Sequence, residues 1–156
     1  MKIDITNLQD VVRPNRKAIR RAAKTALHDL LGCYSVVLVD NEQIREINSK
    51  YLGRSEPTDV IAFPFEEAPL TKDDCAGEII ISTQIAASEA QSRRIDVEAE
   101  MILYVVHGAL HLAGYDDATP EQAEAMHQRE KEILAELGYD VQSLWKPLKT
   151  KQKRAR

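Results

Sequence analysis

The sequence has 156 residues, of which 44% are hydrophobic and 29% are charged, with a net charge of −4. This composition is typical of one soluble globular domain, large enough to bury a hydrophobic core. No apolar run approaches the length of about 18 residues that a membrane-spanning helix needs, and no repeat or low-complexity segment is present.

The first ten residues, MKIDITNLQD, lack the basic and apolar regions of a secretory signal. We therefore expect a cytoplasmic protein in which Cys33 is a small buried side chain and Cys75 a loop thiol, both reduced. Residues 146–156 carry six basic residues and no acid, whereas residues 1–145 carry 15 basic and 25 acidic residues. We expect a single domain over residues 1–145 and a basic tail over 146–156 that is either disordered or in contact with phosphate groups.

The first predicted elements are a strand over residues 2–8 and a helix that begins near Pro14 and ends at Gly32. The helix has apolar residues, Leu30 and Leu31 included, at the spacing of one face. Its other face carries a basic stripe, formed by Arg16, Lys17, Arg20, Arg21 and Lys24. A solvated surface is the slightly favoured interpretation of this stripe, and a phosphate-binding patch is the alternative.

Three further strands and one helix are predicted in the middle of the chain. Residues 34–39, YSVVLV, form a β-branched run typical of a strand with some burial on both faces. A helix over residues 41–53 and a loop over 53–57 lead into a strand over 59–65. Residues 66–76 predict a surface hairpin connection, and the three consecutive isoleucines in 77–83 predict a strand inside the sheet.

Three helices follow, one from Thr83 onward, one over residues 97–113 and one over 120–137. The second is apolar nearly all round, which is typical of a buried helix. Glu100 in its first turn is expected to be exposed, and the alternative is a role in supporting the metal ligands from two turns before His107. His127 in the last helix is expected to face solvent. Together these elements predict an α+β domain with a four-stranded mixed sheet, about five helices and the 97–113 helix at its centre.

The stretch HGALHLAGYDD, residues 107–117, is the candidate site. His107 and His111 are four residues apart and share one face of a helix, and Gly114 allows the chain to turn and bring Asp117 back. Two imidazoles and one carboxylate would leave the fourth position of a zinc ion open, as in catalytic sites. We expect one divalent metal ion here, with zinc favoured; the alternative is a pair of hydrogen-bonded core histidines.

The metalloprotease motif, in which a glutamate general base directly follows the first histidine, is not satisfied. Gly108 occupies that position. A bound water would have to be activated by the ion itself or by another carboxylate.

Three segments together resemble the YbeY family of metal-dependent endoribonucleases: HGALHLAGYDD, PTDVIAFPF at residues 57–65, and GEIIIS at residues 77–82. Their order and spacing extend the resemblance over residues 3–139. It implies cleavage of single-stranded RNA during ribosomal RNA maturation, with the ribosome or small-subunit proteins as partners. It also implies that Thr58 and Asp59 line the active cleft.

The chain departs from the family pattern at two positions. Asp117 replaces a third histidine, and a harder, anionic ligand favours oxygen-loving metals more than three imidazoles would. Leu52 replaces an arginine that follows the tyrosine matching Tyr51. Arg54, two residues further on, is therefore the candidate catalytic arginine.

Two alternative functions stay open. The histidine pair would also suit a zinc-dependent peptidase, although Gly108 argues against it. A non-catalytic ribosome-associated factor with a structural metal is the third hypothesis, and it predicts that a folded Asp117→Ala variant keeps its cellular function.

Overall fold

The computed structural model describes residues 1–140, so the basic tail predicted over residues 146–156 lies outside the described part. The first half of the described chain contains β1 (Lys2–Asn7), α1 (Arg16–Leu27), β2 (Cys33–Val39), α2 (Asn41–Leu52) and β3 (Val60–Pro64). The second half contains β4 (Cys75–Ser82), α3 (Thr83–Arg93), α4 (Val97–Leu112) and α5 (Pro120–Glu136).

The four strands form one sheet in the order β1-β2-β4-β3. β1, β2 and β4 are parallel, and β3 is antiparallel to β4, its hairpin partner. The predicted α+β fold with a four-stranded mixed sheet is confirmed. So is the interior place of the isoleucine-rich strand, since β4 has a neighbour on each side.

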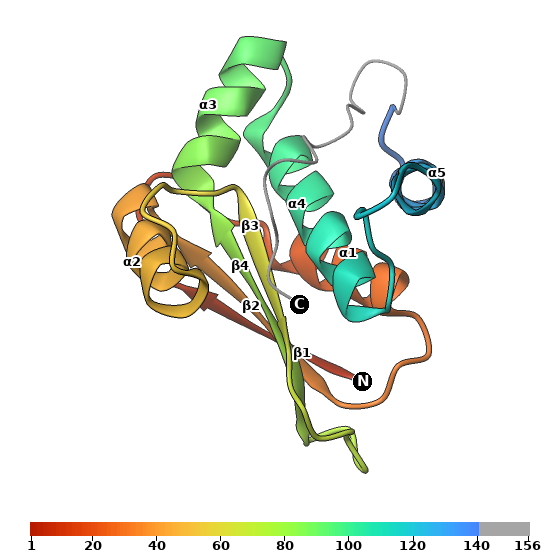
Figure 1. The fold of residues 1–156 in the computed structure, drawn as a ribbon. Coiled ribbons are helices and arrows are strands. Elements are labelled where there is room, and N and C mark those ends of the chain that lie inside the picture. Colours follow the sequence, from red (N-terminus) through yellow and green to blue (C-terminus); the bar gives the residue numbers. More distant parts are fainter. Residues whose placement is uncertain (141–156) are drawn as a thin grey trace.

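Helices cover both faces of the sheet (Figure 1). Val36, Leu38, Ile79 and Ile81 belong to the main core, together with residues of α1, α4 and α5. The alternate strand positions, such as Val39 and Ile80, form a smaller cluster with α2. The period-two alternation of side chains explains why residues 36–39 of β2 and 79–81 of β4 are apolar at every position: these segments are covered on both sides.

α4 is the central helix, and it packs against α1, α3, α5, β3 and β4. Gly108 allows its close approach to the sheet. A Cβ atom at this position would lie 2.6 Å from Ile79 Cγ2 and 3.2 Å from Val60 Cγ2. A larger residue here would have to push helix and sheet apart.

The predicted end of the first helix at Gly32 is wrong, because α1 ends at Leu27. His28 has a positive φ of 49° and its backbone N–H donates to Lys24 O, which caps the helix four residues earlier. Leu30 and Leu31 continue the apolar spacing but lie exposed in the following turn. The two leucines have the spacing of a helix face but lie beyond the end of the helix.

The basic stripe of α1 is exposed, and two of its members have a structural role. Arg16 Nη1 donates to Ile5 O at 3.1 Å, and Arg20 Nε donates to Ile3 O at 3.3 Å. β1 is an edge strand, so these carbonyl oxygens have no strand partner on that side. The two arginines thus cover the edge of the sheet, which protects it from pairing with another chain.

The remaining expectations about the surface can be compared with residues 1–140. Cys33 is buried and both cysteines are free thiols, as predicted. Cys75 is exposed, but it is the first residue of β4 and not part of a loop. No helix among these residues is both long enough and apolar enough to cross a membrane.

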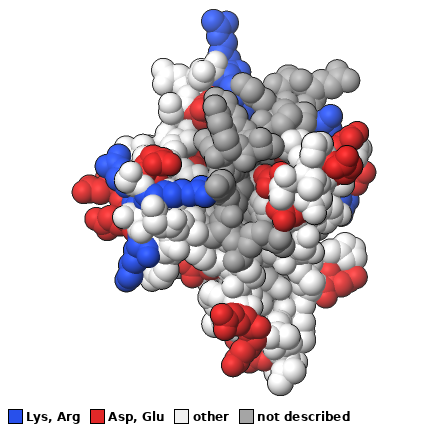
Figure 2. Space-filling view, viewed as in Figure 1, with Lys and Arg blue, Asp and Glu red and all other residues white. Residues whose placement is uncertain are grey.

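The β3–β4 hairpin projects from the body and carries exposed acids at its tip (Figure 2). These acids include Glu66, Glu67, Asp73 and Asp74.

Candidate metal centre

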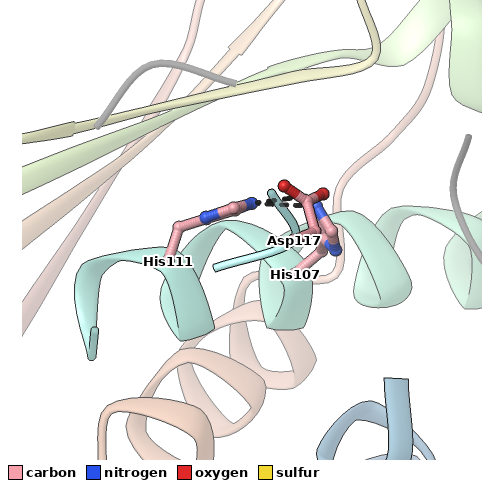
Figure 3. A group of neighbouring side chains, drawn as sticks. All are labelled: His107, His111 and Asp117. Atoms are coloured by element: carbon pink, nitrogen blue, oxygen red, sulfur yellow. Dashed lines mark hydrogen bonds and ion pairs between the residues drawn. The ribbon is translucent and has the colours of Figure 1, made fainter. Parts of the chain in front are cut away.

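The end of α4 and the turn beyond it bring His107, His111 and Asp117 together (Figure 3). Gly114 makes this possible with a φ of 102°, a conformation that side chains disfavour. The backbone N–H of Tyr115 donates to Leu110 O at 2.9 Å, which fixes the reversal of the chain. The predicted convergence of the three side chains is present in the structure.

The ligand atoms are spaced as a small cation requires. Nε2 of His107 and Nε2 of His111 are 3.2 Å apart, close to the separation of about 3.3 Å between two donors of a tetrahedral zinc ion. An oxygen of Asp117 lies 3.9 Å from His111 Nε2, and the three donors are all within 4.8 Å of one another. Two nitrogens and a carboxylate are a donor set that suits a divalent transition metal.

Burial differs across these three side chains. His107 and His111 are almost completely buried, whereas 17% of the Asp117 side chain is exposed. The centre is therefore closed on the helix side and accessible on the side of the turn. A site with one open side can admit a water or a substrate group, unlike a closed structural site.

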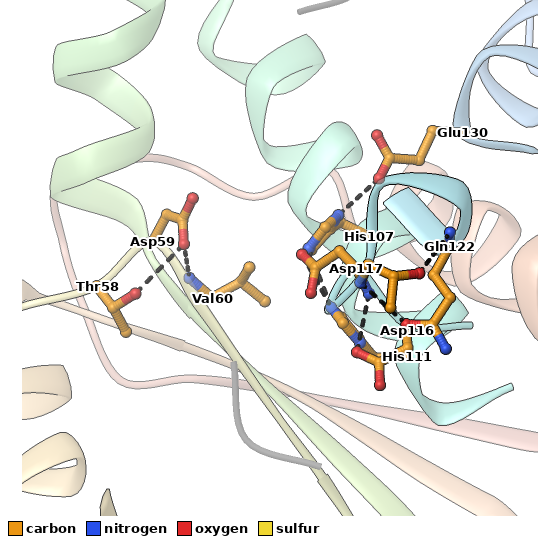
Figure 4. A network of polar contacts seen from close by, with 10 residues as sticks. Thr58, Asp59, Val60, His107, His111, Asp116, Asp117, Gln122 and Glu130 are labelled. Atoms are coloured by element: carbon orange, nitrogen blue, oxygen red, sulfur yellow. Dashed lines mark hydrogen bonds and ion pairs between the residues drawn. The ribbon is translucent and has the colours of Figure 1, made fainter. Parts of the chain in front are cut away.

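Glu130 belongs to the same network and was missed by the sequence analysis. It comes from α5, and its Oε1 lies 2.6 Å from Nδ1 of His107, with both side chains 0% exposed (Figure 4). A signal was present in the spacing. The buried residues of α5 are Ala123, Met126, Glu130, Ile133 and Leu134, so Glu130 is the one acid on the apolar face.

A second polar cluster lies on the same face of α4, two turns before His107. Glu100 is 1% exposed and pairs with Arg93 Nη1 at 2.6 Å, so the prediction that it is solvent-facing is wrong. Burial raises the pKa of Glu100, and the nearby charge of Arg93 partly opposes this. Burial also raises the pKa of Tyr104, the next residue on this face, which hydrogen-bonds to Glu100.

The start of β3 packs against the side of α4 that faces the sheet. Val60 contacts the position of Gly108, the residue after His107. Thr58 and Asp59 are buried, and Asp59 Oδ1 accepts hydrogen bonds from the Val60 N–H at 2.8 Å and the Thr58 hydroxyl at 3.4 Å (Figure 4). These bonds hold the local turn, and the family-based role of the two residues in the cleft stays a prediction.

The structure leaves the predicted role of Arg54 untested. Arg54 is half-buried in the loop between α2 and β3, where its backbone N–H donates to Asn48 O at 3.3 Å.

His127, expected to face solvent, is instead half-buried, with its Nε2 atom inaccessible. The helix face that carries His127 is therefore partly covered.

The surroundings of Gly108 argue against the peptidase hypothesis. A side chain at Gly108 would point at Ile79 and Val60, into the contact between α4 and the sheet. A glutamate there would face the hydrophobic core and could not reach a water beside His107 and His111. The helix face that would hold the general base of a metalloprotease is used for packing.

Comparison with known proteins places the whole described fold in one group. The family model described as "Endoribonuclease YbeY" matches residues 2–138. The curated endoribonuclease YbeY of Syntrophus aciditrophicus (strain SB) is 36% identical over 142 residues, which cover 86% of this chain and 88% of that protein. Among solved structures, the solution structure of TM1509 from Thermotoga maritima matches with a TM-score of 0.62 and 27% identity, over 86% of this chain and 88% of that one.

Proposed function

Since this chain belongs to the endoribonuclease YbeY family, we propose that it cleaves single-stranded RNA with the help of one divalent metal ion held by His107, His111 and Asp117. The family consists of nucleases, so the chain is a hydrolase that acts on RNA. The observation that carries the metal assignment is the convergence of three donor atoms within 4.8 Å at the partly open end of α4.

Each side chain has a defined part in this proposal. The two Nε2 atoms and the Asp117 carboxylate hold the ion, which, when bound, lowers the pKa of a coordinated water or polarises a phosphoryl oxygen. The buried side of the site is built by α4 and α5, and Glu130 of α5 contacts the ring of His107. Asp117, at the accessible side, stands where a flexible RNA strand would approach.

The metal requirement can be tested on the purified chain. We expect cleavage of a single-stranded RNA to stop after chelation and to return when metal is added back. A duplex of the same sequence should be cleaved far more slowly, because its backbone cannot bend into a partly enclosed site. Activity that survives complete removal of metal would overturn the proposal.

The identity of the ion is a separate proposal. Zinc is favoured by the two imidazoles, and Asp117 should broaden the choice toward manganese or magnesium compared with a third histidine. We expect the Asp117→His variant to bind zinc with a larger preference over manganese than the natural chain does. Equal zinc-to-manganese affinity ratios in the two proteins, measured by competition titration, would contradict this.

Arg54 is proposed as the residue that contacts RNA phosphate in place of the arginine missing at position 52. We expect Arg54→Ala to reduce the rate of RNA cleavage by about 100-fold without loss of metal, because one arginine contact with developing phosphate charge contributes several kcal/mol. Arg45→Ala, on the exposed surface of α2, is the matched control. Undiminished cleavage by Arg54→Ala would remove it from the mechanism.

The cellular role that we propose is maturation of ribosomal RNA in the cytoplasm, in contact with the ribosome or small-subunit proteins. It is supported by membership of the family and by the three sequence segments that resemble it. Cells that lack the protein should accumulate ribosomal RNA precursors with unprocessed ends. A folded Asp117→Ala variant that restores processing would instead favour a non-catalytic ribosome-associated factor.

A further inference from the structure

The interior of the molecule contains a carboxylate that the proposed chemistry does not use directly. Glu130 lies on the apolar face of α5, between Met126 and Ile133, and is 0% exposed. A buried acid is costly unless its oxygens are hydrogen-bonded, and its Oε1 lies 2.6 Å from Nδ1 of His107, which is equally buried. An apolar residue of similar size at this position would fill the space without that cost.

The geometry determines what Glu130 does to the histidine. An ionised carboxylate only accepts hydrogen bonds, so beside an ionised Glu130 the Nδ1 atom of a neutral His107 carries the proton. The Nε2 atom of the same ring is then left with its lone pair. This lone pair lies on the side of Nε2 of His111, 3.2 Å away, and of the Asp117 carboxylate.

We propose that Glu130 is a positioning residue that holds His107 in the one tautomer able to bind a metal and fixes the plane of its ring. The inference rests on the proposed metal centre, and it assigns a role to a residue on a different helix. A carboxylate behind a ligating histidine is a general means of orienting the ring and raising its basicity. Through this contact the docking of α5 on α4 becomes part of the site.

The first test measures metal affinity by competition with a coloured zinc chelator. We expect Glu130→Leu to bind zinc about 10- to 100-fold more weakly than the natural chain, as when other such supporting residues are lost. Glu130→Gln should lose less zinc affinity, because its amide oxygen can still accept a hydrogen bond from the Nδ1–H group. Glu132→Gln, which removes an exposed carboxylate from the same helix, is the matched control and should leave the affinity unchanged.

The second test separates positioning from simple packing, and it needs no metal. Nitrogen-15 NMR of the histidine side chains in the metal-free protein reports which ring nitrogen carries the proton. We expect a protonated Nδ1 at His107 in the natural chain and in Glu130→Gln, and a mixture with protonated Nε2 in Glu130→Leu. Thermal unfolding of the metal-free variants shows whether they are folded, and Glu130→Met, which also has no oxygen to accept a hydrogen bond from the Nδ1–H group, replaces Glu130→Leu if that variant is not folded.

The outcomes distinguish this inference from the proposed function. Unchanged zinc affinity and an unchanged tautomer in folded Glu130→Leu would overturn the role of Glu130. In Glu130→Leu, a loss of affinity without any change of tautomer would also overturn it, because the effect would then come from packing or charge alone. Failure of the natural chain to cleave RNA, with the tautomer and affinity results as expected, would refute the proposed activity and leave the role of Glu130 standing.

Discussion

Polar side chains are paired in different ways at the two ends of the buried face of α4. Glu100 and Tyr104 in the first half and His107 and His111 in the second follow one another at spacings of four, three and four residues, which places them on one stripe of the helix. At the first end, Arg93 supplies the positive charge beside Glu100. At the second end, the Nε2 atoms of two imidazoles lie at the separation of two ligands on one ion.

The first cluster is therefore structural, because its cation is Arg93, and the second is a candidate functional site, because its cation would be a bound metal ion. A cation that is part of the chain is always present, so the contribution of the Arg93–Glu100 pair to the fold does not depend on metal concentration. A cation that must come from solution makes the second cluster dependent on metal concentration. Each end can therefore be disrupted separately, with a different measurable consequence.

The largest effect is expected from removing a ligand at the second end. His111→Ala should weaken zinc binding by more than about 100-fold, which exceeds the usual effect of losing a supporting residue behind a ligand. Metal content after dialysis, measured by mass spectrometry, checks this. The control is His28→Asn, which changes an exposed histidine and keeps a residue type that tolerates positive φ. Wild-type metal content in His111→Ala would refute the ligand assignment.

Removal of the ion pair at the first end should lower the free energy of unfolding and leave the affinity for zinc unchanged. Arg93→Met leaves the Glu100 carboxylate buried without its partner, which typically costs about 3–5 kcal/mol. Urea unfolding of the metal-free protein measures this loss, and zinc titration of the folded variant should match the natural chain. Arg129→Met, in an exposed pair with Glu132, should have little effect on either. A variant of normal stability that fails to bind zinc would contradict the division.

Gly108 directly follows His107 and lies on the face of α4 that meets the sheet. Gly108→Ala should destabilise the protein by about 1–2 kcal/mol, because the overpacking against Ile79 exceeds the gain of about 1 kcal/mol in helix propensity. Thermal unfolding checks the sign. Ser88→Ala, on the exposed side of α3, gains helix propensity without overpacking and is the reference. A stabilised Gly108→Ala would show that α4 and the sheet are not in close contact.

The smallest effect concerns Glu78, a half-buried carboxylate on β4. Burial raises the pKa of Glu78 above its ordinary value of 4.5, so its ionised form disfavours the fold. This penalty is present above the raised pKa and disappears as the pH falls below the unfolded value. Glu78→Gln should therefore be slightly more stable than the natural chain at pH 7 and equally stable at acidic pH. Glu46→Gln on exposed α2 is the control, and a gain that persists at low pH would contradict the assignment.

The sequence alone determined the features that depend on local spacing. Strand alternation, the apolar run of α4 and the four-residue interval between His107 and His111 are periodic patterns within single elements. Each pattern defines which side chains share a face, whatever the rest of the chain does. For the same reason the turn at Gly114 could be predicted to bring Asp117 back toward the two histidines.

Only the tertiary structure decided which partners those faces meet. Glu130 joins His107 from 23 positions further along the chain, because α5 happens to pack across α4. Glu100 is buried by the packing of α3, although a first-turn acid by itself would be expected to face solvent. Spacing determines the direction of a side chain relative to its own helix, and the surroundings it meets depend on long-range contacts that no local pattern records.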